Sequence, residues 1–178
     1  VKDDAKNIST LEDPVEYQVT GINQVTLNSA IGMTFATGLR SLLRQDPDIL
    51  LVGEIRDLET AKISIQAALT GHLVFSTLHT NSACGSISRL MDMDTEPFLL
   101  SSALRGVLAQ RLIRLLCTYC RKVQPVDAHM LDRLGLPASK GPYTFYGPVG
   151  CPKCSQTGYR KRDRVFECLT ITREIQEK

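Results

Sequence analysis

An acidic residue closes a short apolar run in the first third of the chain. Residues 49–52 read Ile-Leu-Leu-Val, and Gly53 and Glu54 follow them. Four consecutive apolar residues are typical of a parallel strand that is buried on both faces. A carboxylate just after the carboxyl end of such a strand lies where open α/β sheets bind ligands. We therefore expect Glu54 to hold Mg²⁺ or to polarise water, although the pattern alone also fits an ordinary buried strand with a capping acid after it.

Two further sets of polar residues follow expected strands. Glu12 and Asp13 precede Pro14 at the end of an extended segment, where paired acids could bind Mg²⁺ or orient an attacking water, or could simply form a solvated turn. His79 comes just before an expected helix, where free N–H groups and the helix dipole favour a phosphate. His72 follows Gly71 and could instead cap the helix that Gly71 ends.

The cysteines form two C-x-x-C pairs, Cys117/Cys120 and Cys151/Cys154. Four thiolates in this arrangement can close a tetrahedral Zn²⁺ site with Zn–S distances of about 2.3 Å. Such a site can replace a core that is too small to fold alone. The alternative is four reduced cysteines that share this spacing by chance. Cys84 and Cys168 lack a paired neighbour, and we expect both to be buried as small apolar side chains.

The elements that must position these residues follow from apolar spacing. Apolar residues at i, i+4, i+7 and i+8 predict four helices. Short apolar runs predict strands, and their alternation with helices predicts parallel βαβ units in an α/β fold. Asp57 can cap the second helix, Gly71 can end it, and Asn81 or Ser82 can cap the third. The helical patterns span Phe35–Leu43, Ala61–Leu69, Ala83–Met91 and Leu100–Leu108; strands are expected at 49–52 and 73–77, with extended segments at 8–11 and 24–27.

Composition sets further limits. After Leu116, prolines and glycines interrupt every periodicity except a short helix near 127–134, so a small appendage is expected there.

The net charge of +2 argues against a dedicated nucleic-acid binder. No apolar run approaches the roughly 20 residues that span a bilayer, and residues 1–10 contain no signal-peptide core, so we expect a cytoplasmic protein. In that compartment six cysteines favour metal or free thiols over disulfides.

Taken in order, these stretches resemble the ATPases of type II secretion and type IV pilus assembly. TLEDPVEY resembles the Asp box of that family, LRQDPDILLVGEIRD its Walker B signature, GHLVFSTLHTN its His box, and LLCTYC with GCPKC its four-cysteine zinc element. The resemblance covers about residues 7–171. Retraction motors of the same superfamily resemble the first part equally well but as a rule lack the zinc knuckles.

The resemblance implies a role for each residue. Glu12 would activate the attacking water, Glu54 would be the Walker B carboxylate, and His79 would contact the γ-phosphate region of ATP. Asp13, Arg56 and His72 would support cofactor binding, and Cys117, Cys120, Cys151 and Cys154 would bind Zn²⁺. The implied cofactors are therefore ATP, Mg²⁺ and Zn²⁺.

The family also implies an architecture and partners. The expected fold is an α/β RecA-like P-loop NTPase core with a four-cysteine zinc-binding subdomain: residues 1–116 of the ATPase domain, 117–158 as the subdomain, and 159–178 returning to the ATPase domain. The implied assembly is a homo-hexamer that drives pseudopilin or pilin assembly. It would lie on the cytoplasmic side of the inner membrane, with an inner-membrane platform protein and a cytoplasmic adaptor as partners.

The chain departs from the family in two places. No G-x-x-x-x-G-K-[ST] loop is present, although that loop cradles the β- and γ-phosphates of ATP. We therefore expect a partial ATPase core lacking Walker A that neither binds ATP tightly nor hydrolyses it alone. The family also tends toward glycine at the positions of Lys161 and Arg164, so the turn there is expected to differ in shape.

Other classes remain open. A DNA-uptake or retraction motor of the same superfamily is one alternative. The basic run Arg160-Lys161-Arg162 suggests another, a non-catalytic zinc-stabilised module that binds nucleic acid or protein. Aromatic residues make up only 6% of the chain and no groove-reading helix is evident, so no direct nucleic-acid contact is expected.

Overall fold

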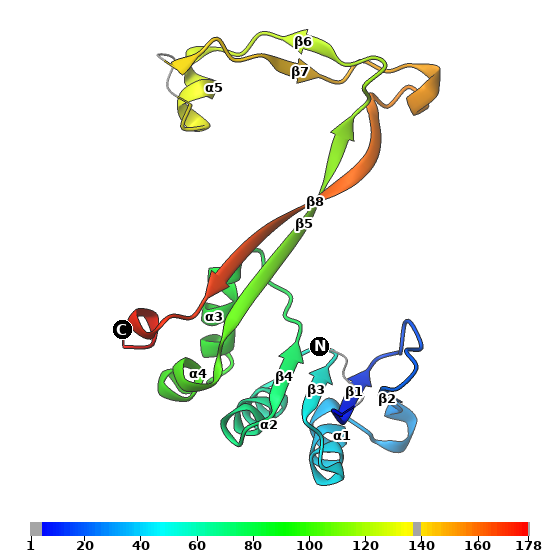
Figure 1. The fold of residues 1–178 in the computed structure, drawn as a ribbon, viewed down its shortest axis with the longest axis vertical. Helices are drawn as coiled ribbons and strands as arrows, with labels where there is room; N and C mark the ends of the chain where they lie inside the picture. Colours follow the sequence, from blue (N-terminus) through cyan, green and yellow to red (C-terminus); the bar gives the residue numbers. More distant parts are fainter. Residues whose placement is uncertain (1–4, 137–139, 178) are drawn as a thin grey trace. The chain divides into compact units, whose positions relative to one another are not determined.

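The chain forms two compact units (Figure 1). A computed structural model describes residues 5–136 and 140–177. The first unit combines the residues up to Ala109 with those from Glu167 onward, and the second comprises Gln110–Phe166. Each unit is described by itself.

A parallel four-stranded sheet forms the centre of the first unit. Its strands are β1 (Ile8–Glu12), β2 (Asn23–Thr26), β3 (Ile49–Val52) and β4 (Leu73–Ser76), in the order β2-β1-β3-β4. Leu11 pairs with Val52 in the β1–β3 ladder, and Val52 pairs with Ser76 in the β3–β4 ladder. The predicted strand at 49–52 is confirmed, the other three lie within one residue of their expected bounds, and the mixed α/β class is confirmed.

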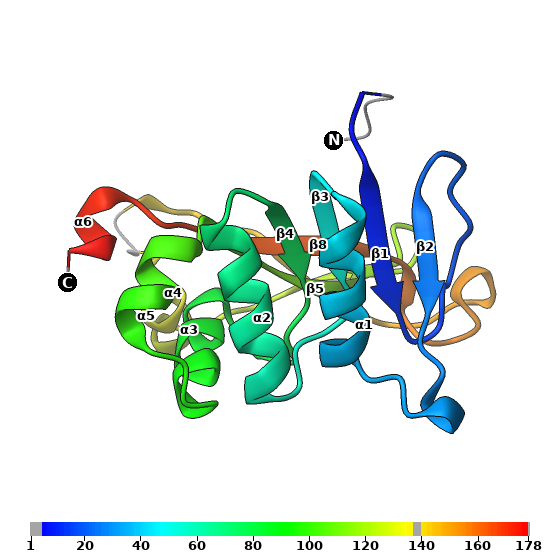
Figure 2. The ribbon, with the colours of Figure 1, turned by 90° about the horizontal axis from the view of Figure 1, so that it is seen from below.

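Two helices pack on the sheet and form the main core (Figure 2). They are α1 (Phe35–Leu42) and α2 (Leu58–Leu69). Leu11, Leu50 and Val52 share one face of the sheet because side chains alternate along a strand. They pack against side chains of both helices, including Leu39 and Ala67. A second cluster joins α2 to α3 (Ala83–Asp92) and α4 (Pro97–Ala103).

Local capping residues set the helix ends as expected. Asp57 accepts a hydrogen bond from the Thr60 N–H, 2.8 Å away, and starts α2. Gly71 lies just beyond the end of α2 with φ of 103°, in the left-handed region that glycine enters without strain. Ser82, rather than Asn81, caps α3 by accepting from the Gly85 N–H at 3.1 Å.

The fourth predicted helix is wrong beyond Ala103. Leu104 is extended with ψ of 131°, and Val107 and Leu108 lie in strand β5 (Gly106–Leu116). This strand pairs with β8 (Tyr159–Thr170), which the sequence did not predict. A pairing partner more than 40 residues away provides the backbone hydrogen bonds that a local helix would otherwise have made.

The second unit contains little regular structure beyond its part of the β5–β8 ladder. Strands β6 (Lys122–Gln124) and β7 (Phe145–Gly147) pair antiparallel. The short helix predicted near 127–134 is confirmed as α5 (Ala128–Arg133), which Asp127 caps. In the first unit a last helix, α6, spans Arg173–Gln176. Among the described residues, none of the helices has both the length and the apolar character needed to cross a bilayer.

Candidate functional site

Three of the predicted site residues lie at one edge of the parallel sheet. Glu12 is the last residue of β1, Glu54 follows β3 by two residues, and His79 follows β4 by three. Because the strands are parallel, their carboxyl ends meet at the same edge. Residues far apart in the sequence are thereby brought to one side of the sheet.

Glu54 is held from both sides at this edge. Nη2 of Arg56 lies 2.5 Å from one carboxylate oxygen, and Nε2 of His79 lies 3.1 Å from the other. The side chain of Glu54 is only 14% exposed, whereas those of Arg56 and His79 are 61% and 88% exposed. The carboxylate is therefore shielded, and its two partners face solvent, where they can change partners.

The contacts of Glu54 favour its charged form. The hydrogen bond from Arg56 is the largest cause of a lowered pKa for Glu54, which partial burial opposes and His79 reinforces. The pKa of Arg56 is raised by the same hydrogen bond and, to a smaller extent, by the nearby charge of Asp13. Arg56 thus interacts with Glu54, which follows β3, and with Asp13, which follows β1.

Gly53 allows the two strand ends to approach closely. Its N–H donates to the Leu11 carbonyl at 2.7 Å. A Cβ added at Gly53 would lie 3.0 Å from that carbonyl oxygen, 3.3 Å from the Phe35 ring and 3.4 Å from Cα of Glu12. A larger residue would push apart the backbone that carries Glu12 and Glu54.

Glu12 has its own partners, which the sequence analysis did not identify. Oε1 of Glu12 accepts hydrogen bonds from Oγ1 of Thr10 at 2.6 Å and from Nε2 of Gln24 at 3.1 Å. Both donors lie on strands that the sequence predicted, and their positions alternate with those of core residues. This alternation places the two donors on the opposite face of the sheet from the core, and it is the signal that could have identified them as partners of Glu12.

His72 lies away from the other candidate residues. It immediately precedes β4, at the opposite edge of the sheet from Glu12, Glu54 and His79. Its Nδ1 lies 2.9 Å from the Ala67 carbonyl and 3.2 Å from Oγ1 of Thr70, so the ring binds the carboxyl end of α2. In this structure His72 thus binds the end of the helix, and its support of cofactor binding stays a prediction.

The second unit brings its four cysteines together. The sulfurs of Cys117, Cys120, Cys151 and Cys154 all lie within 4.8 Å of one another. The distance from Cys117 to Cys151 is 4.0 Å, that from Cys120 to Cys154 is 3.8 Å, and that from Cys151 to Cys154 is 3.7 Å. A tetrahedron with metal–sulfur distances near 2.3 Å has edges of about 3.8 Å, so this cluster has the right size to hold a metal ion.

Backbone donors reach this cluster. Cys154 Sγ accepts from the N–H groups of Cys151 and Gly158, at 3.2 and 3.3 Å. Burial is the largest single cause and raises the pKa of Cys154, but these two donors, together with side-chain hydrogen bonds to Cys151 and Cys120, outweigh it and lower that pKa to about 6. Burial raises the pKa of Cys120 to about 11. A site of this kind favours at least one thiolate, the form that binds metals.

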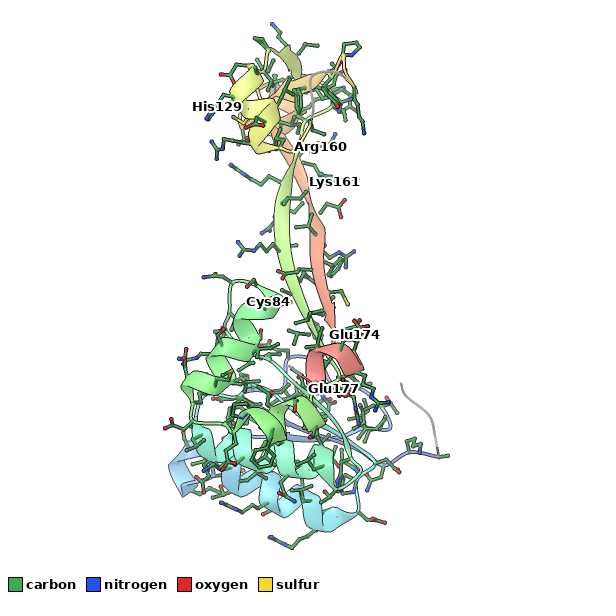
Figure 3. The ribbon with its side chains drawn as sticks, turned by 90° about the vertical axis from the view of Figure 1, so that its left-hand side faces the viewer. Cys84, His129, Arg160, Lys161, Glu174 and Glu177 are labelled. Atoms are coloured by element: carbon green, nitrogen blue, oxygen red, sulfur yellow. The ribbon has the colours of Figure 1, made fainter. Side chains whose placement is uncertain are left out.

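The remaining two cysteines are not buried, contrary to the sequence prediction. Cys84 lies at the start of α3 (Figure 3) and Cys168 on β8, and both are exposed rather than buried. For Cys168 the reason is that it lies on β8, which is exposed along most of its length.

Charge is divided unequally between the two units. Residues 110–166 contain eleven lysines and arginines but three acidic residues, whereas the whole chain has 21 basic and 19 acidic side chains. The net charge of the chain is small only because acidic residues outside 110–166 offset the strongly basic second unit. Cations lie over tyrosine rings there: Lys153 is 3.9 Å from the Tyr119 ring centroid and Arg121 is 4.5 Å from that of Tyr146.

Comparisons with known proteins identify the family of the chain. The family model described as "Type II/IV secretion system protein" matches residues 1–178. The chain belongs to this family. It is 57% identical over 171 residues to the type II secretion system protein E of Pectobacterium carotovorum subsp. carotovorum, covering 96% of this chain and 34% of that protein. It is 52% identical over 173 residues to the type IV pilus assembly ATPase PilB of Myxococcus xanthus (strain DK1622), covering 96% of this chain and 31% of PilB.

A solved structure of the pilus retraction motor PilT with bound ADP is similar to this secretion-family chain in fold. The TM-score is 0.64 at 30% sequence identity, covering 97% of this chain and 40% of PilT. The chain spans about a third of the length of the curated relatives it matches. The chain therefore corresponds to a segment of each of these longer proteins.

Proposed function

We propose that this chain is the C-terminal part of a RecA-like ATPase domain, from a protein that uses ATP hydrolysis to drive pseudopilin or pilin assembly. The observation that carries the proposal is the convergence of Glu54, Arg56 and His79 at the carboxyl edge of a parallel sheet in a chain of this family. The names of two relatives, a secretion protein E and a pilus assembly ATPase, support the same reading.

Each proposed residue has a task that its contacts suit. Glu12, anchored through Oε1, would accept a proton from the attacking water. Glu54 would supply the Walker B carboxylate, with Arg56 and Asp13 setting the charge around it. His79, which is mostly exposed, would contact the γ-phosphate region. Bound Mg²⁺ with ATP would neutralise charge that develops on the phosphates.

The four-cysteine cluster is proposed to bind Zn²⁺. Its sulfur–sulfur distances match a tetrahedral thiolate site, and Zn²⁺ accepts four cysteine ligands in structural sites. The second unit has few buried apolar side chains among its described residues, so a bound metal would provide much of its folding free energy. We propose residues 117–158 as this zinc subdomain, with 1–116 and 159–178 in the ATPase domain.

The assembly and location follow from the family. We propose a homo-hexamer on the cytoplasmic side of the inner membrane, with an inner-membrane platform protein and a cytoplasmic adaptor as partners. The likeness to PilT keeps a retraction motor as the alternative within the superfamily, and the four cysteines favour assembly or secretion.

Glu54→Gln in the full-length protein tests the proposal. This substitution keeps the size of the side chain but removes its charge, so the rate of ATP hydrolysis should fall about a hundredfold or more. The matched control is Glu59→Gln, because Glu59 also pairs with an arginine, Arg40 at 2.7 Å, but lies on the exposed side of α2. Full turnover in the Glu54→Gln protein, or an equal loss in both variants, would reject the proposed site.

The basic second unit supports a second candidate function, a module that binds an anionic polymer. Eleven basic side chains against three acidic ones provide the charge that such binding requires. Binding of a fluorescent single-stranded oligonucleotide should then weaken steeply between about 50 and 200 mM salt. No binding at the lower salt concentration would remove this candidate.

A further inference from the structure

The side-chain amide of Gln24 makes three hydrogen bonds at the edge that carries Glu12. Its Nε2 donates to Oε1 of Glu12 at 3.1 Å and to the Tyr17 carbonyl at 3.0 Å. Its Oε1 accepts from the Val19 N–H at 2.6 Å. Since the amide nitrogen meets two acceptors and the oxygen meets a donor, the orientation of this side chain is fixed by its surroundings.

The register of the sheet places Gln24 beside Glu12. Gln24 pairs with Thr10 in the parallel β1–β2 ladder. Thr10 and Glu12 lie on the same face of β1 because they are two residues apart. Gln24 therefore reaches the Glu12 carboxylate from the neighbouring strand, while Thr10 reaches it from within β1.

These contacts treat the two oxygens of Glu12 differently. Oε1 accepts from both Thr10 and Gln24, and Thr10 is only 4% exposed. Within residues 5–136 and 140–177, no hydrogen bond to Oε2 of Glu12 is found. One oxygen is thus an anchor, and the other keeps its lone pairs for a proton from a bound water.

We propose that Gln24 is a positioning residue for the reaction, which fixes the Glu12 carboxylate so that Oε2 is presented to the attacking water. The same amide holds the segment between β1 and β2 through Tyr17 and Val19, so the orientation of Glu12 is coupled to that segment. This inference rests on the proposed role of Glu12 in ATP hydrolysis. Gln24 itself touches no reacting atom.

Two substitutions in the full-length protein separate positioning from support of the segment. Gln24→Met preserves length and removes all three hydrogen bonds. Gln24→Glu retains an oxygen to accept from the Val19 N–H but replaces the donor to Glu12 with a carboxylate. If Gln24 positions Glu12, both variants should lose about ten- to a hundredfold in kcat for ATP hydrolysis, with KM for ATP changed less than about threefold.

A double substitution supplies the decisive measurement. In a Glu12→Gln background the carboxylate no longer takes the proton, so adding Gln24→Met should cause no further loss of kcat. Gln66→Met, at an exposed position of α2, is the matched control and should leave kcat unchanged. Losses that multiply in the double variant, or a Gln24→Glu protein with full kcat, would overturn the proposal.

The outcomes also distinguish this inference from the proposed function. An active Glu12→Gln protein would reject the role of Glu12 and with it the proposed chemistry. An inactive Glu12→Gln protein together with a fully active Gln24→Met protein would reject only the positioning role. A rise in KM with unchanged kcat would assign Gln24 to nucleotide binding instead and would equally contradict the inference.

Discussion

His79 and Glu54 meet across the ends of two neighbouring strands. Nε2 of His79 lies 3.1 Å from Oε2 of Glu54, although the two residues are 25 positions apart in the sequence. The contact exists because β3 and β4 run parallel in register, which brings the segments after Val52 and Ser76 to the same edge. A histidine that is 88% exposed is thereby paired with a carboxylate that is 14% exposed.

The lowered pKa of Glu54 predicts a pH dependence of stability. Because the folded chain holds this proton less tightly than the unfolded chain, the unfolded state binds more protons between the two pKa values. The stabilisation by Glu54 should be complete above its ordinary pKa of 4.5 and should disappear as the pH falls through the lower folded value. Urea unfolding of the chain and of Glu54→Gln should differ at pH 7 and converge on acidification. A difference that grows with acid would contradict this assignment.

Removal of metal should unfold the second unit selectively. If the four cysteines bind one Zn²⁺, the purified chain should contain about one equivalent of metal, and a strong chelator should abolish amide protection in residues 110–166 first. Cys154→Ser should lose the metal. Cys168→Ser, at an exposed position of β8, serves as the control and should retain it. A metal-free folded chain in which the four clustered thiols titrate as freely as the exposed Cys84 and Cys168 would exclude the site.

Lys161→Gly should stabilise the chain. Lys161 lies on β8 (Figure 3) with φ of 71°, in the left-handed region that strains a residue with a Cβ. Glycine adopts this conformation freely, so the free energy of unfolding should rise by about 0.5–1 kcal/mol despite the greater entropy of the unfolded chain. Arg162→Gly, at a neighbour without positive φ, should lower stability instead. Urea unfolding of the metal-loaded variants measures both changes, and a stabilised Arg162→Gly chain would argue against this account.

ATP should leave the stability of this chain unchanged. Most of the positioning of a phosphate chain comes from a Walker A loop, and the sequence contains no such motif. A ligand raises stability by RT ln(1 + [L]/Kd), so a weakly held nucleotide at micromolar concentration should not shift the thermal midpoint. Differential scanning fluorimetry with and without Mg·ATP measures this directly. An ATP-dependent shift would show that other residues of the chain hold the nucleotide.

The sequence alone was sufficient where the determinants are local. The strand at 49–52, the cap at Asp57 and the left-handed Gly71 follow from apolar patterns and from side chains that bind their own neighbouring backbone, and the cap of the third helix was narrowed to Asn81 or Ser82, of which the structure shows Ser82. The spacing of the cysteines likewise indicated a cluster, because two C-x-x-C turns each bring two thiols together regardless of the rest of the fold.

Tertiary structure decided everything that depends on distant partners. Residues expected at the end of a helix lie instead in the β5–β8 ladder. His72 lies at the opposite edge of the sheet from Glu54, and Cys84 and Cys168 are exposed rather than buried. The anchoring of Glu12 by Gln24 needed the β1–β2 register, which no local pattern specifies. Residue types and their spacing therefore determined which groups could do chemistry, whereas the long-range pairing of strands determined which of them meet, since hydrogen bonds between strands form only after distant segments are brought together.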